Sequence, residues 1–255
     1  MKLLLLCIAS FYFISCHQKE KLKGGVCLSF DDRYINEWFE LRDLFLNNEV
    51  KVTFFITQLN SLSTDEIQKL KLLQNDGHEI GFHGMHHVLS EHYIKEHSYQ
   101  EYFEYEINPG IRWMDSLEFN CTSFAYPYGA KYWFTDYLLG EKFEVLRGVS
   151  SLKRSLNIVE NDAVFYSHSG NKTVDAIGFD VISAIDTLMI NEAIDRSVNN
   201  SEVLLLFAHR PSHHPDKGYS FNIEGLKYII KKVKENDLNF YLVNELGNKE
   251  LFKEQ

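Results

Sequence analysis

Val-Cys-Leu-Ser-Phe at residues 26–30, Val-Lys-Val-Thr-Phe-Phe-Ile at 50–56 and His-Glu-Ile-Gly-Phe at 78–82 are three apolar runs of strand length. Residues 37–47 and 64–73 lie between these runs and have the spacing of amphipathic helices. An order of strand, helix, strand, helix, strand predicts a parallel sheet with right-handed crossovers. This first stretch of the body therefore predicts an α/β fold.

The rest of the body continues the same pattern. Further strands are predicted at 123–126, 203–208 and 240–243, and further helices at 181–197 and 223–235. No repeat or low-complexity linker interrupts residues 25–250, so we expect a single domain. Polar, reactive residues follow several of the strands, which favours a (β/α) barrel over an open sheet.

Length and charge narrow the class of protein. The chain has 255 residues, of which 45% are hydrophobic, with 26 Lys and Arg against 36 Asp and Glu, so its formal net charge is −10. This is an ordinary globular composition, long enough to bury a full core. The acidic balance, with no basic block in the body, argues against nucleic acid as a partner. We expect a monomer.

The first 16 residues have the form of an export signal. Met1 and Lys2 precede an apolar run over residues 3–15, which is too short to span a bilayer comfortably. Residues 13–15 before Cys16 resemble a bacterial lipobox, in which the cysteine is lipidated; plain signal cleavage nearby is the alternative. Residues 17–23 are polar and suit a short tether. We expect an exported protein, lipid-anchored to the periplasmic or cell-surface side of a bacterial membrane.

Two cysteines remain in the folded body. Cys27 and Cys121 lie in apolar, strand-like runs, which is typical of buried free thiols. An oxidising compartment would also permit a bridge between them.

Carboxylates and histidines follow the first and third strands. Asp31 and Asp32 come directly after a strand, where successive side chains alternate faces, so one can bind a cation while the other remains a base. His83, His86 and His87 have the spacing that brings two imidazoles onto one side of a helical turn. An isolated Asp pair is usually a solvated turn, and a histidine cluster is as often a surface feature. Together, two histidines and a carboxylate predict a catalytic type of metal site with one open position.

Four segments resemble, in order, the motifs of a known family. Ser-Phe-Asp-Asp-Arg at 29–33 is similar to Thr-Phe-Asp-Asp-Gly, and the segment 77–83 with His87 to His-Ser/Thr-x-x-x-His. Phe-Ala-Tyr-Pro-Tyr-Gly at 124–129 is similar to Phe-Arg-Pro-Pro-Tyr-Gly, and residues 204–209 to an apolar strand that ends in histidine. These are motifs of the polysaccharide deacetylases, the NodB homology domain of carbohydrate esterase family four. The resemblance covers about residues 24–246.

The resemblance implies a deformed (β/α) barrel as the catalytic domain, over residues 24–250, with one divalent metal ion, usually zinc. Asp32, His83 and His87 would hold the ion. Asp31 would be the general base toward a metal-activated water, whose pKa falls toward about 7, and His209 the acid that protonates the departing amine. The backbone N–H of Tyr128 would stabilise the oxyanion.

The sequence also departs from the family pattern. Ala125 stands where the third motif has an arginine that orients the base. Arg33, Arg147 and Arg210 are candidates to replace it, and Arg147 is preferred because it follows a strand-like run. Gly84 replaces the hydroxyl residue of the second motif. We identify no counterpart of the fourth motif, whose aspartate orients the acid histidine.

Other residues are candidates to contact the substrate. Tyr126, Pro127, Tyr128 and Arg147 are assigned to the oxyanion or substrate side of the site. Aromatic rings such as Trp133 could stack on sugars, although in a chain that is 14% aromatic most rings belong to the core. The loop 210–216 could line the cleft or be a solvated turn.

We therefore expect a metal-dependent hydrolase that removes N-acetyl groups from an amino-sugar polysaccharide or cell-wall glycan. Two alternatives remain open. An O-acetyl esterase would use the same residues, and a glycan-binding protein would have kept the barrel while losing turnover, as Ala125 and the missing fourth motif suggest. Asp31 and His209 weigh against mere binding. No Gly-x-Ser-x-Gly elbow of a serine hydrolase occurs.

Overall fold

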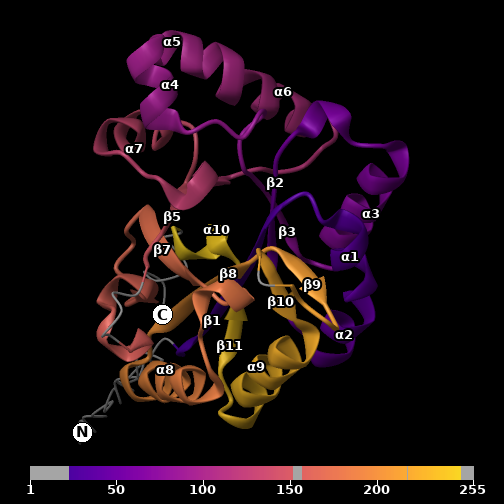
Figure 1. The fold of residues 1–255 in the computed structure, drawn as a ribbon, viewed down its shortest axis with the longest axis vertical. Helices are drawn as coiled ribbons and strands as arrows, with labels where there is room; N and C mark the ends of the chain where they lie inside the picture. Colours follow the sequence, from indigo (N-terminus) through magenta and orange to yellow (C-terminus); the bar gives the residue numbers. More distant parts are fainter. Residues whose placement is uncertain (1–22, 152–156, 217, 248–255) are drawn as a thin grey trace, which may run out of the picture.

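Seven parallel strands form a closed barrel in the computed structural model of the chain, which describes residues 23–151, 157–216 and 218–247 (Figure 1). The barrel closes because β1 (Gly25–Asp32) pairs with β8 (Val203–Ala208) as well as with β2 (Thr53–Ile56). The predicted (β/α) barrel is thus confirmed. The signal segment 1–16, Cys16 and all of the tether except Lys23 lie outside the described residues.

The remaining strands complete or flank the barrel. Between β2 and β8 the ring runs through β3 (Glu79–Phe82), β4 (Ser123–Ala125), β5 (Val145–Val149) and β7 (Thr173–Gly178). Two strands extend the sheet, namely β11 (Asn239–Tyr241), parallel to β1, and β6 (Phe165–Tyr166), antiparallel to β8. A small separate sheet joins β9 (Arg210–Ser212) and β10 (Ser220–Asn222).

Helices surround the barrel. They are α1 (Ile35–Glu40), α2 (Arg42–Asn48), α3 (Thr64–Asn75), α4 (Ser90–Glu96), α5 (Tyr99–Tyr102), the π-helix η2 (Phe103–Ile107), α6 (Asn108–Ser116), α7 (Trp133–Leu139), α8 (Thr187–Asn200), α9 (Ile223–Glu235) and α10 (Val243–Leu246). Short 3₁₀ turns follow several strands, among them η3 (Pro127–Gly129) and η6 (Val181–Ser183). Helices α4, α5 and α6 lie together along one side of the barrel (Figure 1).

Several element predictions are confirmed and two are wrong in detail. Helix α3 begins with the capping box of Ser63 and Glu66, and β8 and α9 have the predicted bounds. The helix predicted at 37–47 is instead split at Leu41 into α1 and α2. The helix predicted from residue 181 begins only at Thr187, because a 3₁₀ turn and the N-cap Asp186 precede it.

The strands are apolar on both faces because each face meets its own core. In β8, Leu204 and Leu206 belong to the large core beneath the helices, whereas Leu205 and Phe207 belong to the core inside the barrel. Successive side chains of a strand point to opposite faces, so once one residue is known to face the barrel interior, every second residue along the strand faces it too. Cys27 belongs to the interior core, and Asp31, four residues later, continues that face.

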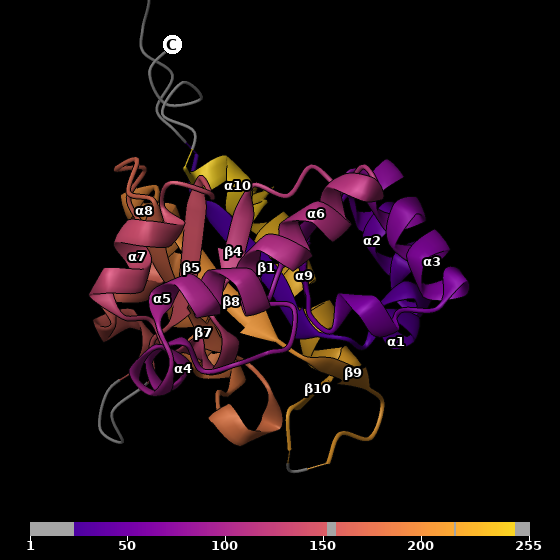
Figure 2. The same cartoon turned by 90° about the horizontal axis from the view of Figure 1, so that it is seen from above.

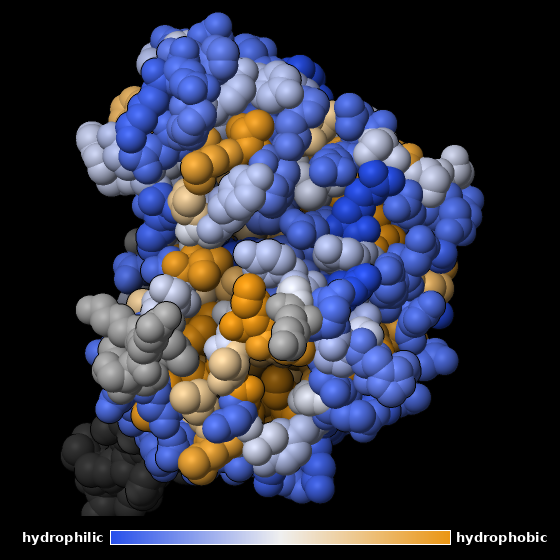
Figure 3. Space-filling model, in the orientation of Figure 1, coloured by the Kyte–Doolittle hydropathy of each residue, from blue (hydrophilic) through white to orange (hydrophobic). Residues whose placement is uncertain are grey.

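The ends of the strands that carry the polar residues point toward one end of the barrel. The loop joining β9 to β10 lies on the opposite side of the molecule from α10, as Figure 2 shows. Apolar side chains gather beneath α4–α6 on the face drawn in Figure 3.

Cys27 and Cys121 are both free thiols, as the apolar surroundings predicted. Within the described part of the chain, no helix has both the length and the hydropathy to cross a membrane.

Candidate active site

A cleft of about 400 Å³ opens at the ends of the barrel strands. It is lined by Asp31, Asp32, His83, His87, Tyr128, Gly129, Val149, Phe207, His209 and Tyr219. Six of these are residues that the sequence singled out, and they come from β1, β3, η3 and β8 or the residues just after them. Parallel strands of a barrel end at the same rim, which is why residues so distant in sequence meet.

Two histidines and a carboxylate converge on one point of this cleft. The ligand atoms of Asp32, His83 and His87 all lie within 4.8 Å of one another. The Nε2 atoms of His83 and His87 are 3.2 Å apart, and Oδ1 of Asp32 lies 3.6 Å and 3.4 Å from them, respectively. Three atoms this close, all able to offer lone pairs, form the kind of donor set that binds a divalent ion.

The surroundings of His83 keep its imidazole neutral. Its Nδ1 lies 2.8 Å from the carbonyl oxygen of Ala125, so Nδ1 carries the proton and donates it, and Nε2 keeps its lone pair for the cleft. Burial lowers the pKa of His83 to about 4, and the nearby charges of His87 and Arg147 act in the same direction. For Asp32, burial raises the pKa, but the hydrogen bond from His87 and the other histidines of the cleft outweigh it, and the pKa lies below its usual value.

The two histidines do not share a helical turn, contrary to the spacing-based prediction. His83 lies at the end of β3 and His87 in the loop that follows, and no helix begins before Ser90. The chain instead reverses through left-handed residues, with φ of 82° at Gly84 and 61° at His87. Asp32 (φ 84°) is left-handed too, and such strained residues often occur at functional sites.

Asp31 is buried and paired with an arginine from another strand. Nη2 of Arg147, which has no exposed surface, donates to Oδ2 of Asp31. The guanidinium also lies 5.3 Å and 4.9 Å from the ring centres of Phe55 and Phe207. Oδ1 of Asp31 is buried and has no hydrogen-bond partner among the described residues.

The register of the barrel explains how Arg147 reaches this position. Ala125 on β4 and Arg147 on β5 are paired in the sheet. Both side chains lie in the barrel interior, because Ala125 and Val145 belong to the interior core and Arg147 is two residues after Val145. The small Ala125 leaves room for the guanidinium of its neighbour. Arg33 and Arg210, the other candidates, pair with Glu66 and Asp216.

His209 is held by an aspartate that sequence reasoning missed. Nδ1 of His209 lies 2.6 Å from Oδ2 of Asp180, whose Oδ1 accepts the backbone N–H of His209 at 3.1 Å. Burial lowers the pKa of His209, but the hydrogen bond to Asp180 and the charge of Asp31 outweigh it, and the pKa is raised. Asp180 follows β7, and the pair Phe179-Asp180 repeats the pair Phe30-Asp31 at the end of β1. That repeat was the available signal.

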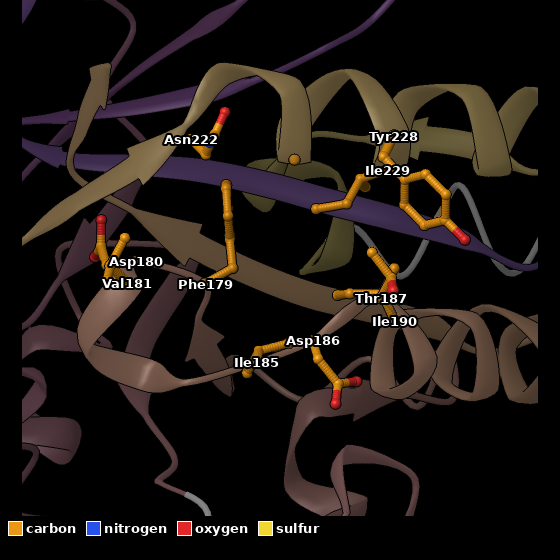
Figure 4. Close-up of a pocket in the computed structure, with 11 residues that line it drawn as sticks. Phe179, Asp180, Val181, Ile185, Asp186, Thr187, Ile190, Asn222, Tyr228 and Ile229 are labelled. Carbon is orange, nitrogen blue, oxygen red and sulfur yellow. The ribbon is translucent and has the colours of Figure 1, made fainter. Parts of the chain in front are cut away.

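Asp180 also separates the cleft from a second cavity. This cavity has a volume of about 170 Å³ and lies between the starts of α8 and α9 (Figure 4). Its lining is mostly apolar and includes Phe179, Ile185 and Ile229. The carboxylate of Asp180 is only 2% exposed, so its interaction with His209 is shielded from water.

Some predicted substrate residues lie elsewhere. Neither Tyr126 nor Pro127 lines the cleft; both are buried, and the hydroxyl of Tyr126 donates to Asp136 at 2.6 Å. His213 and His214 are exposed and do not line the cleft, and neither does Trp133. Tyr219, which the sequence did not single out, has its ring centre 4.9 Å from that of His209.

Comparison with known proteins gives one match in sequence. A family model described as polysaccharide deacetylase matches residues 18–140, which include Asp31, Asp32, His83 and His87 but not Arg147 or His209. No curated protein matches the chain in sequence.

Solved structures match over almost the whole chain. A family 4 carbohydrate esterase from Streptomyces lividans, in complex with acetate, is 13% identical, with a TM-score of 0.57 over 86% of this chain and 93% of that one. The Xyl-CE4 domain of a multidomain xylanase from the hindgut metagenome of Trinervitermes trinervoides is 18% identical (TM-score 0.56; 89% and 91% covered). The peptidoglycan deacetylase PdaC from Bacillus subtilis is 16% identical (TM-score 0.55; 91% and 92% covered).

The fold is therefore the (β/α) barrel of the carbohydrate esterase family 4 deacetylases. The chain is thus similar to the polysaccharide deacetylase family in sequence over residues 18–140 and to carbohydrate esterase family 4 deacetylases in fold over almost its whole length.

Proposed function

We propose that this chain is a metal-dependent deacetylase that hydrolyses N-acetyl groups on an amino-sugar polysaccharide or cell-wall glycan. The observation that carries the proposal is that one cleft holds two residues able to move protons, each fixed by an oppositely charged partner. A possible base, Asp31, is held by Arg147, and a possible acid, His209, is held by Asp180, both beside the three-residue ligand group. Binding alone needs no pair of oriented proton carriers, so this arrangement supports turnover.

Asp31 is the proposed base. Arg147 occupies its Oδ2, which leaves Oδ1 to take a proton from the attacking water. A divalent ion, which we propose is zinc, would be held by Asp32, His83 and His87 and would supply a Lewis acid for the acetyl carbonyl and a lowered pKa for water. The fit rests on the Nε2 lone pair of His83, which the bond to Ala125 turns toward the group.

His209 is the proposed acid. Its Nδ1 faces Asp180, so Nε2 is the atom that donates to the departing amine. The raised pKa of His209 increases the protonated fraction near neutral pH. An amine leaves poorly without a proton, so such an acid suits an amide substrate. We assign the backbone N–H of Tyr128, on the rim of the cleft, to the developing oxyanion.

An O-acetyl esterase is the second candidate function. It would use the same residues, and the similarity to a family 4 carbohydrate esterase and to the Xyl-CE4 domain of a multidomain xylanase supports it. A glycan-binding protein without turnover was suggested by Ala125 and the missing fourth motif. Arg147 and Asp180 weaken that reading, since each supplies an orienting contact from a different element.

We also propose that the protein is exported and anchored by a lipid on Cys16, which would place the cleft on a membrane surface facing cell-wall glycan. The support is the sequence of residues 1–16 alone.

Acetate release by the purified full-length chain tests the function. The substrates are acetylated chito-oligomers and acetylated xylan, and the samples are the native, the metal-stripped and the Asp31→Asn protein. Because general base catalysis contributes about 10²–10⁴-fold, Asp31→Asn should lower release by at least about 10²-fold. Asp115→Asn, which changes an exposed aspartate outside the cleft, is the matched control.

Metal-dependent release from the chito-oligomers would support the deacetylase, and release from xylan alone would move the protein to the esterases. Zinc binding with no release from either substrate would favour the binding protein. Unchanged release by Asp31→Asn would remove Asp31 from the role of base.

A further inference from the structure

The loop that carries His87 has no regular structure of its own to hold it. Residues 83–89 form neither helix nor strand, and His87 is in the left-handed region with a φ of 61°. This conformation is uncommon outside glycine and costs free energy that the surroundings must offset. Contacts from outside the loop therefore help to hold it, among them the hydrogen bond from Oγ1 of Thr57 to the carbonyl of Gly84 at 2.9 Å.

Glu106 supplies further contacts from the π-helix η2. Its Oε2 accepts the backbone N–H of His86 at 2.7 Å, and its Oε1 accepts that of Val88 at 3.0 Å. Its own carbonyl oxygen accepts the N–H of Met85 at 3.1 Å. One residue thus binds the backbone on both sides of His87. Single π-helical turns within helices frequently occur at functional sites.

Glu106 is fully buried, and no Lys or Arg among the described residues forms an ion pair with it. A buried carboxylate without a cation is costly, and here the hydrogen bonds from the loop amides are the largest contributions that offset that cost. The carboxylate also explains Gly84: a Cβ added there would lie 2.1 Å from Oε1 of Glu106. Where the family motif has a hydroxyl residue, this chain has glycine, and Glu106 fills the space.

We propose that Glu106 is the positioning residue for His87: by binding the amides of His86 and Val88, it holds the His87 imidazole in the ligand group with Asp32 and His83. The inference rests on the proposed function, because it assumes that this group binds a divalent ion. Glu106 thus acts on His87 from a separate element between β3 and β4.

Zinc binding to the full-length, chelator-stripped chain tests the proposal, with the dissociation constant measured by calorimetry. Glu106→Gln keeps the size of the side chain but turns an amide NH₂ toward one of the two N–H groups. Orienting partners of metal ligands are typically worth about 10–100-fold in metal affinity, so we expect the zinc Kd to rise by that factor. Glu104→Gln is the control, because Glu104 lies on the same helix, is exposed and contacts only the side chain of Asn108.

The unfolding temperature of the metal-free proteins is measured alongside. A residue that merely stabilised the fold would lower this temperature and leave the zinc Kd of the folded protein unchanged, and that result overturns the proposal. If Glu106→Gln does not fold, Glu106→Asp gives the same reading, since it withdraws both oxygens from the loop while keeping the charge. Failure of the wild type to bind zinc would instead overturn the proposed metal site, and the role of Glu106 with it.

Discussion

His83 and His209 each follow a strand of the same barrel and line the same cleft, yet their pKa values are shifted in opposite directions from the usual value of histidine. The pKa of His83 is lowered to about 4, mainly by burial, whereas that of His209 is raised although burial opposes it. The difference lies in the atom that Nδ1 faces. For His83 it is the neutral carbonyl of Ala125, and for His209 the carboxylate of Asp180. The carboxylate next to His209 favours its protonated form, and the neutral carbonyl next to His83 does not.

The largest effect should come from Asp180→Asn, which removes the charge facing His209 while keeping the volume beside the second cavity. The group must be protonated to donate, so activity falls as pH rises through its pKa. Without the carboxylate, burial dominates and the pKa of His209 falls, so this alkaline limb should move to lower pH. At neutral pH, kcat should fall by about 10²–10⁴-fold. The measurement is the pH profile of acetate release, with the exposed-site variant Asp195→Asn as control. An unmoved limb would show that His209 does not set it.

The next effect concerns Arg147, the cation that is paired with Asp31. Arg147→Met leaves Asp31 buried without its partner, and breaking a buried ion pair in this way costs about 3–5 kcal/mol of unfolding free energy. Urea unfolding of the metal-free protein at neutral pH measures the loss.

The double variant Arg147→Met, Asp31→Asn should recover much of that stability, because it removes both charges. If the double variant were no more stable than Arg147→Met, the loss would come from packing against Phe55 and Phe207, and not from the unpaired carboxylate.

The smallest effect concerns His78, a third histidine that does not line the cleft, where burial lowers the stability of the fold at acid pH. His78 is buried, its Nδ1 accepts the N–H of Val52 at 3.2 Å, and burial lowers its pKa to about 4. The unfolded chain takes up this proton near pH 6.5 but the folded chain only near pH 4, so stability is complete above pH 6.5 and falls as pH drops through this window. The loss approaches about 3 kcal/mol.

Urea unfolding between pH 7 and pH 4 should therefore show a steeper decline for the wild type than for His78→Gln. His92→Gln, at an exposed histidine, should decline like the wild type. Parallel curves for the wild type and His78→Gln would mean that burial at this position does not shift the titration.

The barrel and most of its polar rim could be predicted from the sequence because each piece carries a local signal. Asp31, His83 and His209 each end a short apolar run, and parallel strands bring such ends together. The face of the strand on which a residue lies can be assigned only when the face of a neighbouring residue is known. Ala125 faces the barrel interior, so Tyr126, the next residue, faces the helices and cannot reach the cleft.

The contacts that orient the site were harder to predict because they join separate elements. Asp180 was hidden by the expectation that a helix begins at Val181, whereas the chain makes a 3₁₀ turn there and the helix starts at Thr187. Glu106 lies about 20 residues from the loop it holds, in a π-helical turn that follows no period of 3.6. Arg147 could be proposed only because a base that lacks its usual partner needs some cation.

The register pairing of Ala125 with Arg147 has a consequence for substitutions at these two positions. Ala125→Arg would place a second cation beside Asp31, and Arg147→Ala would leave none there. We expect either variant to be less stable than this chain, since the first puts two like charges in the interior and the second leaves a buried carboxylate unpaired. The cation beside Asp31 therefore depends on residues 125 and 147 together, and a linear motif that covers only residues 124–129 misses it.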